Sequence, residues 1–214
     1  MQKPEAIIFD LDGVLTDTSE YHYKAWKQLA DEEGIPFTHQ ENDEHLRGVG
    51  RRESLMYIIR GRNYSEAQIQ EMMDRKNRYY TEMIKSMSPN DLVAGGKELL
   101  TEIRNAGIKT AIASSSKNCR TVLARLEITS YFDGIADGNS VVNSKPAPDL
   151  FVYAAGLVQV PTPVCLGVED ADAGIEAIKT AGMQALGIGP EERFHRADKV
   201  IPTLASLHLA DMLN

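Results

Sequence analysis

Asp10 and Asp12 are the residues of this 214-residue chain whose type and spacing point most directly to chemistry. They follow the apolar run 6–9, which is typical of a short buried strand, and Gly13 allows the chain to turn directly after them. In an open α/β sheet, ligands bind beyond the carboxyl ends of the strands, so both carboxylates are expected at such an end. Two acids this close can bind a hard cation, share a proton, or divide the roles of nucleophile and acid.

Two plainer interpretations of this segment compete with a catalytic one. Asp and Gly are common in the turns that follow strands, and the Asp-x-Asp-Gly pattern resembles part of a calcium-binding loop. The calcium loop is disfavoured because no Glu closes a loop of the required length. The run Thr16-Asp17-Thr18, which follows the turn, favours the catalytic interpretation.

Three further polar sets follow predicted strands later in the chain. They are Ser114-Ser115-Ser116-Lys117-Asn118, then Lys145 between Ser144 and Pro146, and finally Glu169 with Asp170. Hydroxyls and amides at a helix N-terminus suit a phosphate, a lysine adds a charge-assisted contact, and acids from two strand ends suit magnesium. Taken singly, the sets could be a helix cap, a loop lysine and two acids that stabilise a helix dipole. Their order at successive strand ends favours one shared site.

The spacing of the apolar residues divides the chain into a helical part and a part in which helices and strands alternate. The helical part is predicted to contain helices over 18–34, 52–59 and 65–87. The alternating part is predicted to contain strands over 108–113, 134–137, 164–168, 184–188 and 200–201, and helices over 96–107, 117–126, 149–158, 172–180 and 205–213.

These elements predict an α/β fold, with a Rossmann-like, doubly wound parallel sheet as its core and an inserted all-α helical cap domain. The core is expected to comprise residues 1–15 and 92–214, and the cap residues 16–91. A helical insertion directly beyond a catalytic strand end is well placed to act as a lid.

The composition limits the partners that this protein can have. Apolar residues make up 43% of the chain, enough to fill a core, while the net charge of −8 and the pI of about 5.2 argue against a nucleic-acid partner. No apolar run approaches membrane-spanning length, and the first strand lies too close to Met1 for a signal peptide. Cys119 and Cys165 match no metal or redox spacing and are expected to be buried. We therefore expect a cytoplasmic, monomeric enzyme with no membrane partner.

The order of these motifs resembles the haloacid dehalogenase (HAD) superfamily, in which Asp-x-Asp is followed by Ser or Thr, then Lys, then an acidic pair. Further motifs resemble the β-phosphoglucomutase branch of that superfamily. They lie in segments 9–18, 21–22, 48–51, 54–55, 75–77, 113–118, 144–149 and 169–175. The resemblance extends over the whole chain, including the helical insertion.

This resemblance implies an isomerase that interconverts β-D-glucose 1-phosphate and glucose 6-phosphate, through an aspartyl-phosphate enzyme and β-glucose 1,6-bisphosphate. It makes Asp10 the nucleophile and Asp12 the general acid and base. It assigns Mg²⁺ to Asp10, the backbone carbonyl of Asp12, Glu169 and Asp170. The residues that it implies in binding the sugar phosphate are Thr18, His22, Arg47, Gly48, Val49, Gly50, Arg51, Ser54, Lys76, Ser114, Ser115, Ser116, Lys117, Asn118 and Lys145.

Two other functions stay open on the sequence. The same site could belong to a HAD-type phosphatase that hydrolyses a small sugar phosphate or another monoester, or to a catalytically silent sugar-phosphate binder. The complete set of acids disfavours the silent binder, and the resemblance of Arg51, His22 and Lys76 favours the mutase over the phosphatase. By spacing alone, His22 would be a core histidine and Lys76 a lysine that snorkels from an apolar helix face.

The helical part departs from the best-known family members at two positions. Arg47 stands where they have Lys, which keeps the charge but changes the donor geometry. Gly50 stands where they have Ser, so one hydroxyl on the substrate side is missing. Both departures concern sugar specificity more than phosphoryl chemistry.

Overall fold

Six strands form one parallel sheet in the computed structural model, which describes residues 3–213. They are β1 (Ala6–Phe9), β2 (Lys109–Ala113), β3 (Gly134–Ala136), β4 (Cys165–Glu169), β5 (Gln184–Ile188) and β6 (Lys199–Ile201). Their order across the sheet is β3-β2-β1-β4-β5-β6, and every neighbouring pair is parallel. The chain adds strands first on one side of β1 and then on the other. The direction therefore changes between β1 and β4, which is where open α/β sheets bind ligands.

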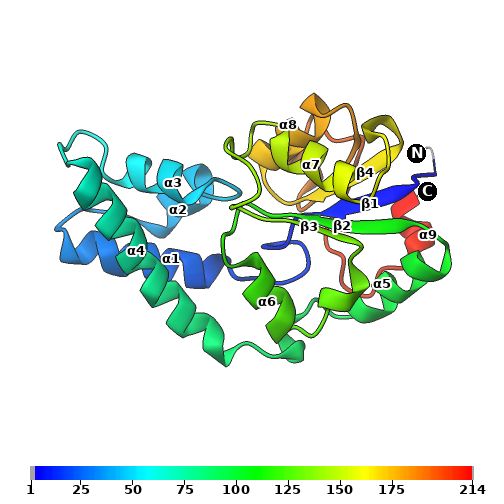
Figure 1. Ribbon diagram of the computed structural model, residues 1–214, viewed down its shortest axis with the longest axis horizontal. Helices are drawn as coiled ribbons and strands as arrows, with labels where there is room; N and C mark the ends of the chain where they lie inside the picture. The colour runs from blue at the N-terminus through cyan, green and yellow to red at the C-terminus, as the bar shows by residue number, and fades with distance from the viewer. Residues whose placement is uncertain (1–2, 214) are drawn as a thin grey trace.

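Helices cover both faces of this sheet (Figure 1), because successive residues of a buried strand point to opposite sides. In β1, Ile7 and Phe9 pack in one apolar cluster, whereas Ala6 and Ile8 pack in another. The first cluster includes residues of α5 (Gly96–Asn105), α6 (Cys119–Arg125) and α9 (Leu209–Leu213), and the second includes residues of α7 (Asp149–Leu157) and α8 (Asp172–Thr180). This arrangement confirms the predicted doubly wound core, and both cysteines are buried in it as predicted.

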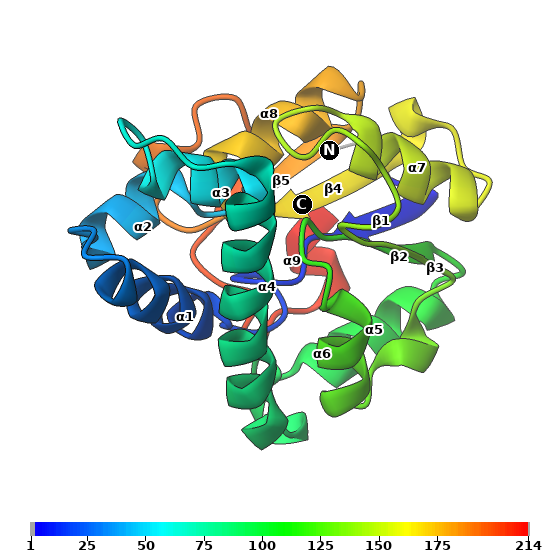
Figure 2. The same cartoon turned by 60° about the vertical axis from the view of Figure 1, so that its left-hand side comes forward.

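A separate group of helices, which we call the cap, lies beyond the carboxyl ends of the strands (Figure 1). It consists of α1 (Ser19–Glu32), α2 (His39–His45), α3 (Arg51–Ile58) and α4 (Glu66–Met83). The cap has an apolar cluster of its own, which includes Trp26, Leu55 and Met72. Figure 2 shows α4 in front of the strand ends, and α4 packs against α1. The inserted all-α cap is thus part of the fold, while its boundaries at residues 16 and 91 stay a prediction.

The chain passes between the sheet and the cap twice, and the two passages are hydrogen-bonded to each other. Thr16 forms an isolated bridge with Leu92, and the backbone N–H of Val93 donates to the carbonyl oxygen of Leu15 at 2.8 Å. The Thr16 hydroxyl donates to the backbone oxygen of Asp91 at 2.7 Å. Because both passages meet at one narrow place, this connection is suited to act as a hinge for the cap.

Three secondary-structure predictions were wrong in detail. Helix α2 was missed because it is almost entirely polar, and a capping box between Thr38 and Glu41 stabilises its start instead of an apolar stripe. The helix predicted over 65–87 ends at Met83 and continues as a 3₁₀ turn, Ile84–Ser86. The last helix was predicted over 205–213 but covers only Leu209–Leu213, because Ser206 adopts a positive φ of 56°. Within residues 3–213, no helix is both long enough and apolar enough to cross a membrane.

Candidate active site

The acidic residues meet at the carboxyl ends of the adjacent strands β1 and β4. Phe9 pairs with Val168 in parallel register, so Asp10 and Glu169 follow side by side. One carboxylate oxygen from each of Asp10, Glu169 and Asp170 lies within 4.8 Å of the others, and all three residues are buried. Because Asp10 is far from the other two in the sequence, only the strand order brings these acids together.

The amine of Lys145 lies between two of these carboxylates. Its Nζ donates to Asp10 Oδ1 at 2.6 Å and to Glu169 Oε2 at 2.8 Å, and the side chain is fully buried. Burial alone would lower the pKa of Lys145, but the charges of Asp10 and Glu169 outweigh it and raise that pKa above its usual value. Burial and then the Asp10 charge raise the pKa of Glu169 well above its usual range, because one ammonium cannot balance three acids.

Asp12 faces the cap rather than the acidic cluster. Strand β1 ends at Phe9, so the alternation of side-chain directions along a strand does not extend to Asp12. The Thr18 hydroxyl donates to Asp12 Oδ1, and His22 Nε2 lies 3.9 Å from Asp12 Oδ2, too far for a hydrogen bond. Burial and then the charge of Asp10 raise the pKa of Asp12 to about 7. A carboxyl with this pKa can both accept and donate a proton near neutral pH, as a general acid and base must.

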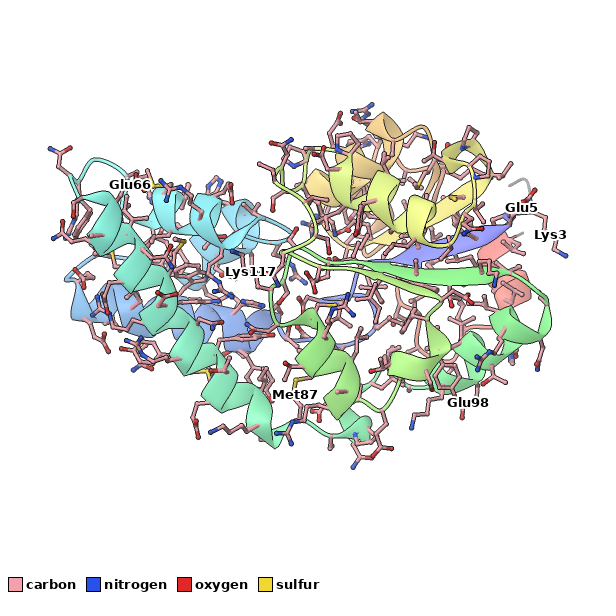
Figure 3. All side chains as sticks on the ribbon, viewed as in Figure 1. Lys3, Glu5, Glu66, Met87, Glu98 and Lys117 are labelled. Carbon is pink, nitrogen blue, oxygen red and sulfur yellow. The ribbon has the colours of Figure 1, made fainter. Side chains whose placement is uncertain are left out.

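A serine-rich turn at the carboxyl end of β2 contacts the cap. The backbone N–H of Ser116 donates to Ser114 Oγ at 3.1 Å, which fixes the turn. Ser115 Oγ donates to the carbonyl oxygen of Gly48 in the cap at 2.9 Å. Lys117, from the same turn, lies where the core faces the cap (Figure 3). This turn therefore supplies hydroxyls and an amine next to the acids.

Two cationic side chains of the cap, the buried Lys76 and the half-buried Arg51, lie on the opposite side. Lys76, on α4, has its Nζ 2.8 Å from His22 Nδ1 and 4.6 Å from the centre of the Trp26 ring. When Lys76 is protonated it can only donate, so Nδ1 is then the acceptor and a neutral His22 carries its ring proton on Nε2. Burial and then the charge of Arg51 lower the pKa of Lys76 well below its usual value, and burial likewise lowers the pKa of His22. Within residues 3–213, neither Lys76 nor Arg51 forms an ion pair with a carboxylate.

The loop at the start of α3 closes onto the core at two further points. Arg47 Nη2 donates to Asp170 Oδ2 at 2.6 Å, so a cap residue contacts the acidic cluster directly. A Cβ atom on Gly50 would overlap the side chain of Ser144, next to the buried lysine of the core. The absence of a side chain at Gly50 therefore permits this close approach of cap and core.

One cavity between the cap and the strand ends brings most of the predicted site residues together. The predicted residues that line it are Asp10, Asp12, His22, Arg47, Gly48, Val49, Arg51, Ser54, Lys76, Ser114, Ser115, Ser116, Lys117 and Asp170. The predicted residues that do not line it are Thr18, Gly50, Asn118, Lys145 and Glu169. Thr18 and Lys145 lie behind the lining and contact it through Asp12 and Asp10.

Four lining residues were missed from the sequence: Ser19, Trp26, Asn42 and Leu46. Ser19 and Trp26 are three and four residues from His22, so helical spacing places all three on one face of α1. That spacing could have identified them. Asn42 gave no such signal because it lies on the polar helix α2, which was not predicted.

The acidic cluster fits a divalent metal ion. Glu169 Oε1 is buried and has no hydrogen-bond partner among the residues that the structure describes. Carboxylate oxygens are the donors that hard cations such as Mg²⁺ prefer, and an unpartnered one is free to coordinate. The carboxylate of Asp12 is not in the cluster, so only its backbone carbonyl could take part.

Comparison with known proteins assigns this chain to a class of protein. Residues 7–188 match the family of haloacid dehalogenase-like hydrolases. The chain therefore belongs to this family, which its doubly wound core and strand-end acids had indicated.

Individual relatives are more specific. The chain is 44% identical over 209 residues to β-phosphoglucomutase from Bacillus subtilis strain 168, which covers 96% of this chain and 92% of that protein. It is 30% identical over 187 residues to the phosphorylated carbohydrates phosphatase of Thermotoga maritima, covering 85% of this chain and 83% of that protein. The crystal structure of β-phosphoglucomutase from Clostridium difficile matches with a TM-score of 0.94 and 38% identity, covering 98% of this chain and 96% of the other.

Proposed function

We propose that this protein is a magnesium-dependent β-phosphoglucomutase, which interconverts β-D-glucose 1-phosphate and glucose 6-phosphate. One observation carries the proposal: Arg51 and Lys76 of the cap line one cavity with Asp10, and neither pairs with a carboxylate of the residues that the structure describes. A donor with a single phosphate needs only the core side of this cavity, whereas a bisphosphate also needs cations on the other side. The similarity to the mutases of B. subtilis and C. difficile supports the same function.

In the proposed reaction, Asp10 carries the phosphoryl group. The 6-hydroxyl of glucose 1-phosphate attacks the phosphorus of phospho-Asp10, the bond from phosphorus to the carboxylate breaks, and β-glucose 1,6-bisphosphate forms. Asp12 accepts the proton of that hydroxyl. After the bisphosphate has turned round, Asp10 attacks the phosphorus of the 1-phosphate, and Asp12 returns the proton to the oxygen on C1. The products are glucose 6-phosphate and phospho-Asp10.

The remaining site residues are proposed to bind and enclose the substrate. Ser114 and Lys145 would hold the transferring phosphate, and Mg²⁺ bound by the acidic cluster and the Asp12 carbonyl would add positive charge there. The other phosphate would bind Arg51, Ser116, Lys117 and Asn118, and the sugar would meet His22 and Lys76. The cap loop 47–50, with Thr18 and Ser54, would complete the closed site and keep water from phospho-Asp10.

Some properties of the protein are proposed on composition and resemblance alone. We propose a cytoplasmic monomer with a cap that comprises residues 16–91, and a core that comprises residues 1–15 and 92–214. The acidic composition disfavours nucleic acid as a partner, and the resemblance implies a small phosphorylated sugar as the ligand.

A phosphatase is the second candidate, because the T. maritima relative carries that name and the same acids could transfer the phosphoryl group to water. The test is a product assay with β-glucose 1-phosphate and Mg²⁺, with and without β-glucose 1,6-bisphosphate as primer. A mutase forms glucose 6-phosphate, faster with the primer, and releases little inorganic phosphate. Stoichiometric inorganic phosphate without glucose 6-phosphate would contradict the proposal and favour the phosphatase.

A further inference from the structure

Asn77 connects the cap to the core on the cationic side of the cavity. Its amide oxygen, Oδ1, accepts a hydrogen bond from Arg51 Nη2 at 2.9 Å and another from Asn118 Nδ2 at 2.8 Å. Asn77 lies on α4 and Arg51 on α3, both in the cap, whereas Asn118 precedes α6 in the core. One oxygen atom therefore joins a side chain of the cap to a side chain of the core.

Arg51 keeps most of its hydrogen-bonding capacity free. A guanidinium has five N–H donors, and Asn77 is its one hydrogen-bond partner among residues 3–213. Asp74 attracts Arg51 electrostatically, but it forms no hydrogen bond with it and instead accepts one from Gln70 at 3.0 Å. Because Arg51 lines the cavity, its unused donors and its charge are available to a ligand there.

Whether the charge of Arg51 is available to a ligand depends on the side chain at position 77. A carboxylate would bind the guanidinium more strongly, through a charge-assisted hydrogen bond, but it would also neutralise the positive charge. An amide oxygen accepts the same hydrogen bond and leaves the charge unchanged. Asn and Asp have nearly the same shape, so Asp at this position would keep the accepting oxygen, add a negative charge and replace the Nδ2 donor, which forms no hydrogen bond among residues 3–213.

We propose that Asn77 is a positioning residue, which orients Arg51 toward a phosphate group without neutralising its charge. Because Asn118 donates to the same oxygen, Asn77 also fixes the position of Arg51 relative to the core. The inference rests on the proposed function in one respect, namely that a phosphate of the sugar phosphate binds at Arg51. Asn77 itself need not touch the substrate.

Three variants test this inference. Asn77→Asp keeps the acceptor and adds a negative charge, Asn77→Leu removes the acceptor, and Asn63→Asp adds the same charge at an exposed position of the cap. For each variant and for the wild type, we would measure the Kd for glucose 6-phosphate by calorimetry in the presence of Mg²⁺, the melting temperature, and kcat and KM in the product assay.

The expected result is a separation of affinity from stability. Asn77→Asp should melt at or above the wild-type temperature, because it pairs more strongly with Arg51, and yet bind glucose 6-phosphate at least about tenfold more weakly. The same change should appear mainly in KM. Asn77→Leu should also bind more weakly, whereas Asn63→Asp should match the wild type in affinity and stability.

Two outcomes would overturn the inference. One is wild-type affinity in Asn77→Asp. The other is an equal loss of affinity in Asn77→Asp and Asn77→Leu, with an equal fall in melting temperature, which would indicate a purely structural role. If the wild type binds glucose 6-phosphate but forms none from β-glucose 1-phosphate, the proposed function fails while the affinities still decide the role of Asn77. If the wild type does not bind glucose 6-phosphate at all, both fail.

Discussion

Lys145 and Lys76 are both buried lysines, one on the core side and one on the cap side of the same cavity, but their surroundings differ. Lys145 contacts the carboxylates of Asp10 and Glu169, and its pKa is raised. Lys76 contacts a ring nitrogen of His22 and the face of Trp26, and its pKa is lowered. Burial lowers the pKa in both cases, so the charge of the neighbours decides the outcome.

This difference shows which kind of charged ligand each side of the cavity can still bind. On the core side, a lysine from the chain itself partly neutralises the acids, and the unpartnered oxygen of Glu169 leaves room for a further cation. On the cap side, the buried amine of Lys76 pairs with no carboxylate in the described part of the chain, an arrangement that costs stability until a negatively charged ligand supplies the missing partner. The protein thus has one side suited to a metal ion and a transferring phosphate, and another suited to a second phosphate.

The largest expected effect is on the core side, at Asp10, the proposed nucleophile. Asp10→Asn keeps the shape of the side chain but removes the charge that is proposed to attack phosphorus, so activity should fall by roughly 10⁴-fold or more. Initial rates of glucose 6-phosphate formation measure this loss, and intact mass with β-glucose 1,6-bisphosphate measures the phosphoenzyme. A phosphorylated Asp10→Asn protein would show that another residue is the nucleophile.

The same substitution at the two lysines should have opposite effects on stability. Lys145→Met leaves Asp10 and Glu169 buried without their partner, and should lower the free energy of unfolding by about 3–5 kcal/mol. Lys76→Met removes a buried charge that has no anion, so the free energy of unfolding should stay the same or rise by about 1 kcal/mol. Urea denaturation at pH 7 with a chelator measures both. Equal losses in the two variants would contradict the comparison.

Magnesium should raise the melting temperature by binding on the core side, independently of the cap lysine. At about 100 times its Kd, a ligand that binds only the folded state adds about 2.7 kcal/mol, or roughly 5–10 °C in melting temperature for a chain of this size. We expect this rise in the wild type and in Lys76→Met, and a smaller one in Glu169→Gln, which lacks a coordinating charge. A melting temperature that does not respond to Mg²⁺, together with full activity in a chelator, would exclude the metal site.

The smallest effect is a difference in the pH dependence of stability. The pKa of Lys76 is lower in the folded protein than in the unfolded chain, so the unfolded chain binds more protons and stability rises with pH toward about 10.4. The advantage of Lys76→Met should therefore shrink between pH 7 and pH 10. The raised pKa of Lys145 contributes stability that is fully present below about 10.4, so the deficit of Lys145→Met should stay constant over that range. Parallel slopes for both variants would contradict this account.

Much of the fold could be predicted because local patterns agree with the tertiary structure. The strand Ala6–Phe9 and the alternation of helices and strands after the cap were visible as apolar runs of the right length. Helix α2 was not, because its stability comes from a capping box and charged side chains rather than from an apolar face. The late start of the last helix depends on one positive φ value, at Ser206, which no periodicity indicates.

More of the candidate site could be predicted from the sequence on its core side than on its cap side. The acids of the core could be grouped from the sequence because the carboxyl ends of parallel strands meet at one edge of a sheet. The site residues of the cap could be assigned only by resemblance, because their electrostatic surroundings depend on contacts between residues that are distant in the sequence. The oxygen of Asn77, for example, joins partners 26 and 41 residues away in the sequence. No spacing rule anticipates that such an oxygen is shared, or that Lys76 lacks a carboxylate.

The central claim is that the cap side of the cavity binds the phosphate that is not being transferred, and Arg51→Ala tests it most directly. Two rates would be measured on this variant: glucose 6-phosphate formation from β-glucose 1-phosphate, and hydrolysis of acetyl phosphate, which has no second phosphate to bind. Arg52→Ala is the matched control, because Arg52 is the neighbouring residue but is exposed and paired with Glu66. It should change neither rate.

Losing a charge-assisted contact at this half-buried arginine should lower the mutase rate of Arg51→Ala by roughly 10- to 100-fold. Hydrolysis of acetyl phosphate should change by less than about threefold, because that reaction uses only the core side. Equal losses in both rates, or no loss in either, would contradict the account and favour a phosphatase.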